Sequence, residues 1–168
     1  MRPDLSRVGT SFHNYINQVT EDELAEAFDK QSASFVRFLE TIPAEKYDYR
    51  YAEDKWTIKE VLQHIIDAER VFSYRALRFA RKDTTPLPGF DENLFAANAK
   101  ADARPWDKLV EEFKVVRRSS ELLFKSFDED QLQSDGISSN SPNYVLALGF
   151  ILIGHAMHHQ KITKERYL

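Results

Sequence analysis

The sequence GFILIGHAMHHQKITKERYL, from Gly149 to Leu168, places two imidazoles on the apolar face of a helix. Positions that are alternately three and four residues apart share one helical face. Extended upstream by a turn, that face carries Val145, Leu148, Leu152, His155, His159 and Ile162. A buried polar group without a partner costs a few kcal/mol. A divalent metal ion would satisfy both rings at once, since histidine is its commonest protein ligand.

The first of three earlier segments with helical periodicity follows Thr20. Thr20 and Glu23 have the spacing of a capping box, which predicts the start of a helix. Pro43 predicts its end, because proline cannot continue a helix. The predicted buried face consists of Leu24, Phe28, Gln31, Phe35, Phe38 and Ile42.

Two further helices follow along the chain. Thr57 and Glu60 form a second capping-box pattern, and the helix that they open is predicted to run to about Lys82. Its apolar residues are Ile58, Val61, Leu62, Ile65, Val71, Phe72 and Phe79. Pro105 suits the first position of the third helix. The third stripe consists of Leu109, Phe113, Val116, Ser120, Leu123 and Phe127.

The connecting segments differ in character. Prolines predict a stiff loop over residues 84–91, and a short helix is predicted around residues 92–99. The segment 128–143 is polar, and we expect it to be mostly irregular. Within it, Ser141-Pro142 resembles a cap and first turn and predicts the start of the last helix.

Four long helices with one apolar face each predict an all-α protein that folds as a four-helix bundle. The low counts of 5 Gly and 6 Pro favour helices over a turn-rich β fold. The stretch between the second and third helices is long enough to cross the bundle. We expect one domain over residues 1–168, with residues 1–19 as an N-terminal arm that packs through Phe12, Tyr15 and Ile16.

Composition excludes several classes of function. The chain has no cysteine, so it forms no disulfide, thiolate nucleophile or cysteine-based zinc site. Its net charge is -4 and it has no basic stripe, which argues against nucleic-acid binding. The longest apolar stretch is about half a membrane span. We therefore expect a cytoplasmic protein that binds neither nucleic acid nor membrane.

A catalytic zinc site needs about three protein ligands, so the histidine pair lacks one. His64 is the natural third ligand, because it flanks the apolar stripe of the second helix. His158 points about 100° away from its neighbour on the last helix and cannot share that face. His13 lies in the arm. The sequence thus predicts a metal site formed by His64, His155 and His159 if the two helices are neighbours.

The motif HAMHH also has the histidine spacing of a zinc protease, but a protease needs a general-base glutamate after the first histidine. That position is Ala156 here, which argues against peptide hydrolysis. A simpler interpretation is a plain helical bundle whose histidines are hydrogen-bonded core residues. Spacing alone leaves metal binding and this alternative about equally balanced.

Four charged residues are candidates for the surroundings of the site. Glu60 and Asp67 lie one turn either side of His64 and could orient a ligand histidine. Salt bridges on the helix surface explain them equally well. Arg75 and Asp91 could reach the mouth of the site, although a surface position is an equal alternative.

Two motifs resemble those of the DinB superfamily of damage-inducible, YfiT-like proteins. Residues 56–70, WTIKEVLQHIIDAER, are similar to the signature W-[ST]-x-K-E-x-x-x-H-x-x-[DE]. Residues 154–160, GHAMHHQ, resemble the closing H-x-x-H-H motif. Residues 75–81 and 86–92 are also typical of one subgroup. The resemblance extends from about Thr20 to the C-terminus.

This resemblance implies a four-helix bundle of up-down-down-up topology with a three-histidine site near one end. The family's ligands map onto His64, His155 and His159, and zinc, nickel or a related divalent ion would be the cofactor. Relatives include thiol S-transferases that use low-molecular-weight thiols, metal-dependent hydrolases and isomerases, and many form homodimers. The frequent family glutamate is replaced by Ala156, which removes any proton-transfer role at that position.

Three hypotheses follow. In the first, the protein is an enzyme whose metal activates water or an external thiol for a small-molecule substrate. In the second, it is a non-catalytic metal-binding scaffold of the stress response, and a fourth protein ligand would close the metal site. In the third, the histidines are satisfied core residues and bind no metal. The sequence assigns no catalytic residue beyond the metal ligands.

Overall fold

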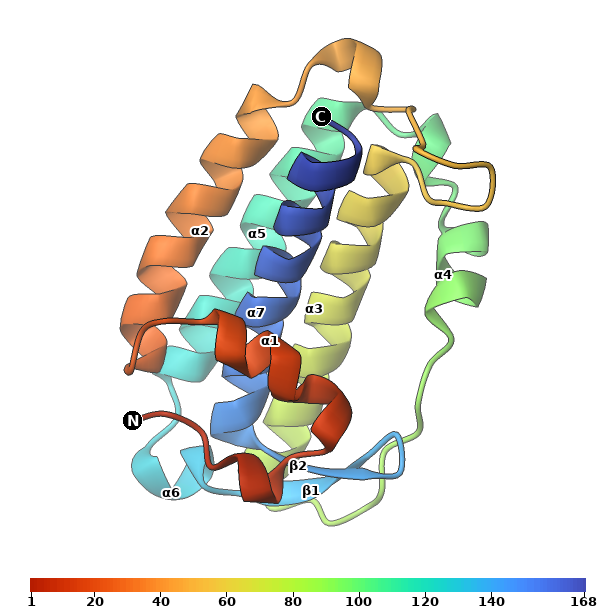
Figure 1. Cartoon of the computed structure of the whole chain (residues 1–168). Coiled ribbons are helices and arrows are strands. Elements are labelled where there is room, and N and C mark those ends of the chain that lie inside the picture. The colour runs from red at the N-terminus through yellow and green to blue at the C-terminus, as the bar shows by residue number, and fades with distance from the viewer.

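Four long helices form the body of the protein, which a computed structural model describes over residues 1–168 (Figure 1). They are α2 (Leu24–Thr41), α3 (Ile58–Ala80), α5 (Trp106–Lys125) and α7 (Val145–Arg166). Helix α7 packs against α2 and α3, and α5 packs against the same two helices from the other side. The predicted four-helix bundle is therefore present. No helix combines the length and apolar character needed to cross a bilayer.

The two predicted capping boxes have different outcomes. The box at the start of α3 is confirmed: the Thr57 hydroxyl accepts from the Glu60 backbone N–H, and the Glu60 carboxylate accepts from that of Thr57. The box predicted at Thr20 is wrong, because α2 begins at Leu24 and has no side-chain cap. Glu23 contacts the ammonium group of Met1 instead.

The N-terminal arm covers α7. It contains two short 3-10 turns, η1 (Leu5–Arg7) and η2 (Thr10–Phe12), and helix α1 (His13–Gln18), which packs along α7. Close packing depends on Gly154, where a Cβ atom would lie 2.0 Å from the backbone oxygen of Tyr15. As a result, α7 is buried all round from its start to Ala156, so the prediction of a single apolar face is wrong for this helix.

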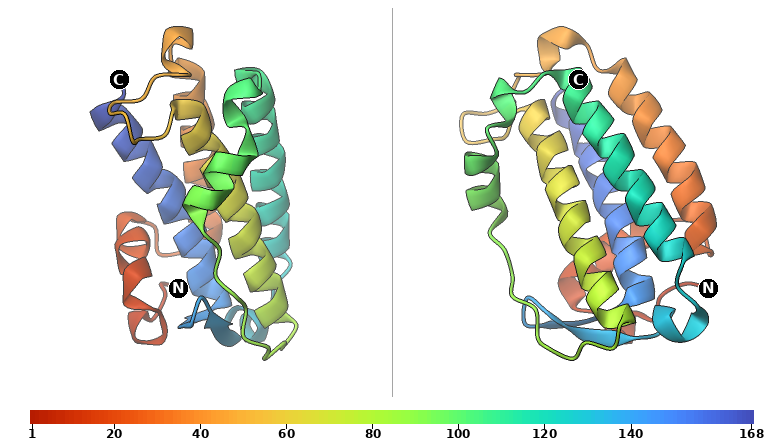
Figure 2. Two further views of the ribbon diagram at one scale, coloured as in Figure 1. Left: turned by 90° about the vertical axis from the view of Figure 1, so that its right-hand side faces the viewer. Right: turned by 180° about the vertical axis from the view of Figure 1, so that it is seen from behind.

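A long connection links α3 to α5. It includes helices α4 (Glu92–Ala99) and η4 (Ala101–Ala103), and the predicted bounds of α4 are confirmed. The connection runs along the outside of the bundle from one end to the other (Figures 1 and 2). Consequently α3 and α5 both begin at the end of the bundle where α7 finishes.

The segment before α7 is more regular than predicted. It contains α6 (Glu129–Leu132) and an antiparallel hairpin of β1 (Asp135–Ser138) and β2 (Ser141–Tyr144). The all-α prediction was incomplete, and Ser141-Pro142 lies in β2 instead of opening the last helix. The hairpin forms because its turn residues Ser139 and Asn140 adopt positive φ angles of 52° and 57°, and β1 also pairs with the loop at Leu87.

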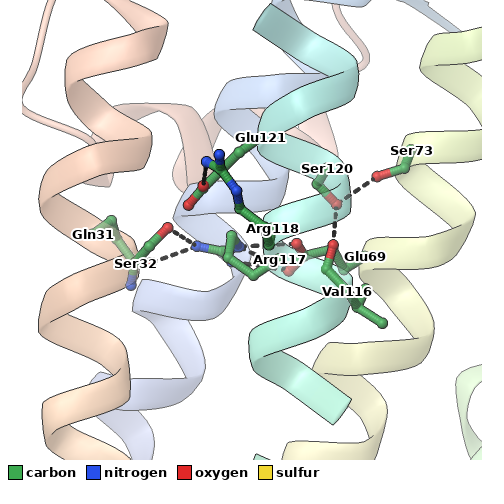
Figure 3. A network of polar contacts seen from close by, with 9 residues as sticks. All are labelled: Gln31, Ser32, Glu69, Ser73, Val116, Arg117, Arg118, Ser120 and Glu121. Carbon is green, nitrogen blue, oxygen red and sulfur yellow. Dashed lines mark hydrogen bonds and ion pairs between the residues drawn. The ribbon is translucent and has the colours of Figure 1, made fainter. Parts of the chain in front are cut away.

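A buried polar layer divides the apolar core in two. One apolar cluster surrounds the arm and the start of α7, and the other lies at the opposite end of the bundle. Between them, the Arg117 guanidinium donates to both carboxylate oxygens of Glu69 and to the side-chain oxygen of Gln31 (Figure 3). Arg117 and Glu69 are each only 2% exposed. His155 of α7 lies at the same level, between the two apolar clusters.

Candidate metal centre

The structure brings together the three histidines that the sequence selected. His64 projects from the second turn of α3, and His155 and His159 project from α7. The Nε2 atom of His155 lies 3.0 Å from that of His64 and 3.1 Å from that of His159. The ligand nitrogens of all three residues lie within 4.8 Å of one another.

Hydrogen bonding within the trio cannot satisfy all three rings. A ring nitrogen of a neutral imidazole carries either a proton or a lone pair, and so donates once or accepts once. The Nε2 atom of His155 makes both short contacts, 3.0 and 3.1 Å, and can form only one good hydrogen bond. The remaining nitrogen needs a partner from outside the protein.

A divalent metal ion fits this arrangement. Ligand nitrogens about 2.0–2.1 Å from one ion, at angles of about 90–110°, lie roughly 2.9–3.4 Å apart. Both contacts of His155 fall in this range. The pair His64 and His159 needs only a side-chain rotation to close on a common ion, because its nitrogens lie within 4.8 Å. The group contains no fourth histidine or carboxylate, so one side is left for a small molecule.

Burial keeps the three rings neutral, which is the form that binds metal. Desolvation lowers the pKa of His64 to about 4 and that of His159 to about 3. The pKa of His155 is lowered well below its usual value, first by burial and then by its histidine neighbours. Around neutral pH the lone pairs are therefore not occupied by protons.

Aromatic side chains hold the rings in place. The indole of Trp56 lies 4.8 Å from the His64 ring, measured between centroids. Tyr15 meets the His155 ring edge-on at 5.4 Å, and Phe72 does so at 5.9 Å. These contacts restrict ring rotation from three directions, since they come from the arm, the loop before α3 and α3 itself.

The trio lies in a cleft of about 430 Å³. The three histidines form part of its wall, so the open side of the cluster faces a space that can hold a small molecule. The other residues that line it are Ser11, Phe12, Tyr15, Trp56, Ala68, Phe72, Arg75, Phe90, Glu92, Ser139 and His158. Glu92 is the one carboxylate among them.

The remaining histidines stay outside the cluster, as predicted. His158 lines the cleft, but its ring packs edge-on against Tyr15 at 5.4 Å and is not part of the group. The ring of His13 contacts the backbone oxygen of Val8 at 3.0 Å. Ala156, which replaces the glutamate of a zinc protease, is fully buried in the core.

The two carboxylates predicted to orient ligand histidines have other partners. Glu60 caps α3 and pairs with Arg50, and Asp67 accepts from the Gln63 amide at 2.9 Å and pairs with Arg70. Of the two alternatives, the structure therefore has the salt bridges. Asp91 caps α4 and does not line the cleft. Arg75 does line it, as one of the alternatives expected.

Several cleft residues were missed as site residues. Phe12 and Tyr15 were predicted only to pack the arm, and Glu92 only to begin a short helix. Ser139 was placed in an irregular segment. The positions of all four depend on contacts between segments far apart in the sequence. The subgroup motif that contains Glu92 was the only signal available.

A helical bundle with three converging histidines in a cleft defines a class of candidate metal proteins. The chain belongs to the DinB superfamily, whose sequence model matches residues 27–162. Its fold is similar to that of YfiT from Bacillus subtilis, described as a probable metal-dependent hydrolase with an unusual four-helix bundle topology. That similarity has a TM-score of 0.71 and 13% identity and covers 86% of each chain. A comparison with curated proteins finds no match.

Proposed function

We propose that this DinB-superfamily protein is a metal-dependent enzyme that activates water or a low-molecular-weight thiol. His64, His155 and His159 would hold the ion, with zinc or nickel the best candidates for an all-imidazole site. One observation carries the proposal: three neutral ring nitrogens converge at the wall of a cleft, with no fourth protein ligand. A structural metal site would be closed by a fourth ligand, which argues against the scaffold alternative.

The metal ion and the residues of the cleft would have different roles in the reaction. When bound, the ion supplies Lewis acidity and lowers the pKa of a water or thiol that it coordinates. Three neutral imidazoles leave the charge of the ion uncompensated. Glu92, the single carboxylate of the cleft, is our candidate to accept the released proton. Trp56 and Phe72 would exclude water from the inner wall.

Hydrolysis and thiol transfer differ in the second substrate, which is water in the first reaction and a thiol in the second. Because the chain has no cysteine, thiol chemistry would require an external thiol. The description of YfiT supports the hydrolase alternative, whereas the family resemblance supports both. The course of the chain in Figure 1 also supports the up-down-down-up order that the family resemblance implies.

Elemental analysis of untagged protein tests the metal site. We expect one divalent ion per chain in the wild type and none in His155→Ala. His158→Ala is the matched control, because this neighbouring histidine is outside the cluster and its loss should leave the metal content unchanged. Full metal content in His155→Ala would refute the ligand assignment.

An activity screen tests the reaction. The metal-loaded protein is assayed with several thiols against electrophilic substrates, beside a panel of esters and amides. Activity that disappears in His155→Ala and persists in His13→Ala supports the proposal, since His13 neither belongs to the histidine cluster nor lines the cleft. Turnover that is equal in the wild type and His155→Ala would refute it.

A further inference from the structure

The cleft that contains the three histidines also contains a buried arginine. Arg75 of α3 is 2% exposed and lines the cleft beside Ser139. Its Nη2 atom donates to the backbone oxygen of Pro88 at 3.1 Å and to the Ser139 hydroxyl at 2.8 Å. Both acceptors are neutral.

Arg75 has no acidic partner. It takes part in none of the ion pairs, whereas the equally buried Arg117 is paired with Glu69. Burial lowers the pKa of Arg75. Glu92, the one carboxylate of the cleft, forms no ion pair with Arg75. Its charge acts on His64 and Tyr15. A buried charge without a counter-ion is costly, so Arg75 is a position that favours an anion.

The surroundings of Arg75 hold it rigidly and leave donors free. The side chains of Phe72 and Phe90 pack near it, with their ring centroids each 5.9 Å from the guanidinium carbon. Nη1 and Nε donate to no protein group. The Ser139 oxygen accepts from Arg75, so its own proton is available to a ligand.

The metal centre and Arg75 are within reach of one small molecule. The Arg75 guanidinium carbon and the His155 ring centroid each lie 5.9 Å from the centroid of the Phe72 ring. Their separation therefore cannot exceed twice that distance. His64, Ala68, Phe72 and Arg75 all line the cleft from one side of α3, so the path between them follows a single helix.

We propose that Arg75 and Ser139 form an anion subsite that binds the charged end of the substrate or thiol. This inference rests on the proposed function, because it places the reacting group at the three histidines and a carboxylate or phosphate at the opposite end of the cleft. The substrate class is a small, elongated molecule with a terminal anionic group.

Metal-free protein tests the subsite independently of the metal. Succinate and phosphate are titrated into the wild type, and the Arg75 Nε–H signal is followed by NMR. We expect this signal to shift with one of the two anions, which identifies carboxylate or phosphate as the preferred group. We expect Arg75→Gln to weaken binding by about tenfold or more and Ser139→Ala by a smaller factor. Arg118→Gln, the control, removes an equal charge from the surface.

A second titration connects the subsite to the metal centre. Zinc-loaded protein is titrated with mercaptohexanoate and with the uncharged mercaptohexanol. We expect the carboxylate to bind more tightly, and Arg75→Gln to abolish this difference without changing the affinity for mercaptohexanol. Thioglycolate, which is too short to span the cleft, should show no dependence on Arg75.

The outcomes separate the two proposals. Equal anion affinity in the wild type, Arg75→Gln and Ser139→Ala would overturn the subsite while leaving the metal site intact. Absence of zinc from the wild type would overturn the proposed function, and anion binding to the metal-free protein would still stand. If Arg75→Gln fails to fold, Arg75→Lys and Ser139→Ala decide, since a loss of affinity in both supports the subsite and unchanged affinity in both refutes it.

Discussion

The interior of the bundle contains two polar clusters that are satisfied in different ways. The Arg117 guanidinium makes three contacts of 2.9–3.1 Å with the carboxylate of Glu69 and one of 2.8 Å with Gln31. The three histidines contact only one another through their Nε2 atoms. The first cluster has opposite charges that hydrogen-bond to each other, although the amide nitrogen of Gln31 has no partner. The second cluster has three equivalent nitrogens and no opposite charge.

This difference distinguishes a structural polar cluster from a candidate ligand-binding one. A buried ion pair whose groups are hydrogen-bonded within the protein holds helices together and needs nothing further. Neutral imidazoles that point at one another are incomplete until a ligand binds between them. Both clusters contain fully buried residues, so burial alone does not identify the functional one. The functional cluster is identified by which of its polar groups lack a partner within the protein.

The largest expected effect comes from breaking the ion pair. Glu69→Ala leaves the Arg117 charge buried and unpaired, and should lower the free energy of unfolding by about 3–5 kcal/mol. Urea titration measures this loss. Lys114→Ala is the control, because both side chains of its pair with Glu40 are exposed and the pair should contribute less than about 1 kcal/mol. Equal losses in the two variants would show that the buried pair is not a structural element.

Replacing both partners sharpens this result. Arg117→Met combined with Glu69→Leu removes both charges and keeps most of the side-chain volume. We expect the double variant to recover most of the stability lost in Glu69→Ala, since apolar residues often replace a buried ion pair without cost. Gln31 would lose an N–H donor, so recovery should be incomplete.

Adding metal should have the next largest effect, and it should act on the other cluster alone. Zinc at about a hundred to a thousand times its dissociation constant stabilises the folded state by about 3–4 kcal/mol. Thermal unfolding of chelator-treated protein with and without added zinc measures this gain. His155→Ala should show no gain, and His13→Ala should show the full gain. A zinc response that is unchanged in His155→Ala would place the metal elsewhere.

The sequence predicted the features that depend on residues close together in the chain. Helical periodicity located α2, α3, α5 and α7, and the capping pattern fixed the start of α3 because all its hydrogen bonds lie within four residues. The same periodicity selected the three histidines, because each lies on the inner face of its own helix. Whether they bind metal stays a prediction.

Contacts between distant segments were not predicted. Arg117 interrupts the apolar face of α5, but its partner Glu69 lies on another helix, so no local pattern pairs them. The hairpin depends on packing as well as on its own residues: a Cβ at Gly136 would lie 2.3 Å from the Phe79 ring. Tyr15 reaches the site only because Gly154 lets the arm approach α7. Each miss reflects a long-range contact that one segment cannot specify.

A smaller effect is expected from pH on metal-free protein. The pKa values of His64 and His159 are lowered to about 4 and about 3 in the folded state, against about 6.5 when unfolded. The unfolded chain therefore binds more protons below neutral pH, and stability falls as pH falls. From pH 7 to 6 the loss is about 0.7 kcal/mol for each histidine, or about 2 kcal/mol for the trio. Urea titration at the two pH values measures it.

The Arg117 cluster provides the contrast for this experiment. It contains no histidine, the residue type whose ordinary pKa lies in this range, so it should contribute no pH dependence between pH 6 and 7. Replacing His64, His155 and His159 with leucine should flatten most of the slope, with His158 leaving a remainder because burial also lowers its pKa. An unchanged slope in this variant would mean that other groups control the pH response.

The smallest effect is expected at the edge of the ion-pair network, where a hydrogen bond is duplicated. The hydroxyls of Ser73 and Ser120 lie 3.0 Å apart, and the Ser120 hydroxyl also lies 3.1 Å from the backbone oxygen of Val116 (Figure 3). In Ser73→Ala, Ser120 keeps its bond to Val116, so no buried donor is left without an acceptor. The loss should be about 0.5–1 kcal/mol in urea titration, well below that of Glu69→Ala. A loss as large as that of Glu69→Ala would show that the network acts as one unit and not through its central ion pair.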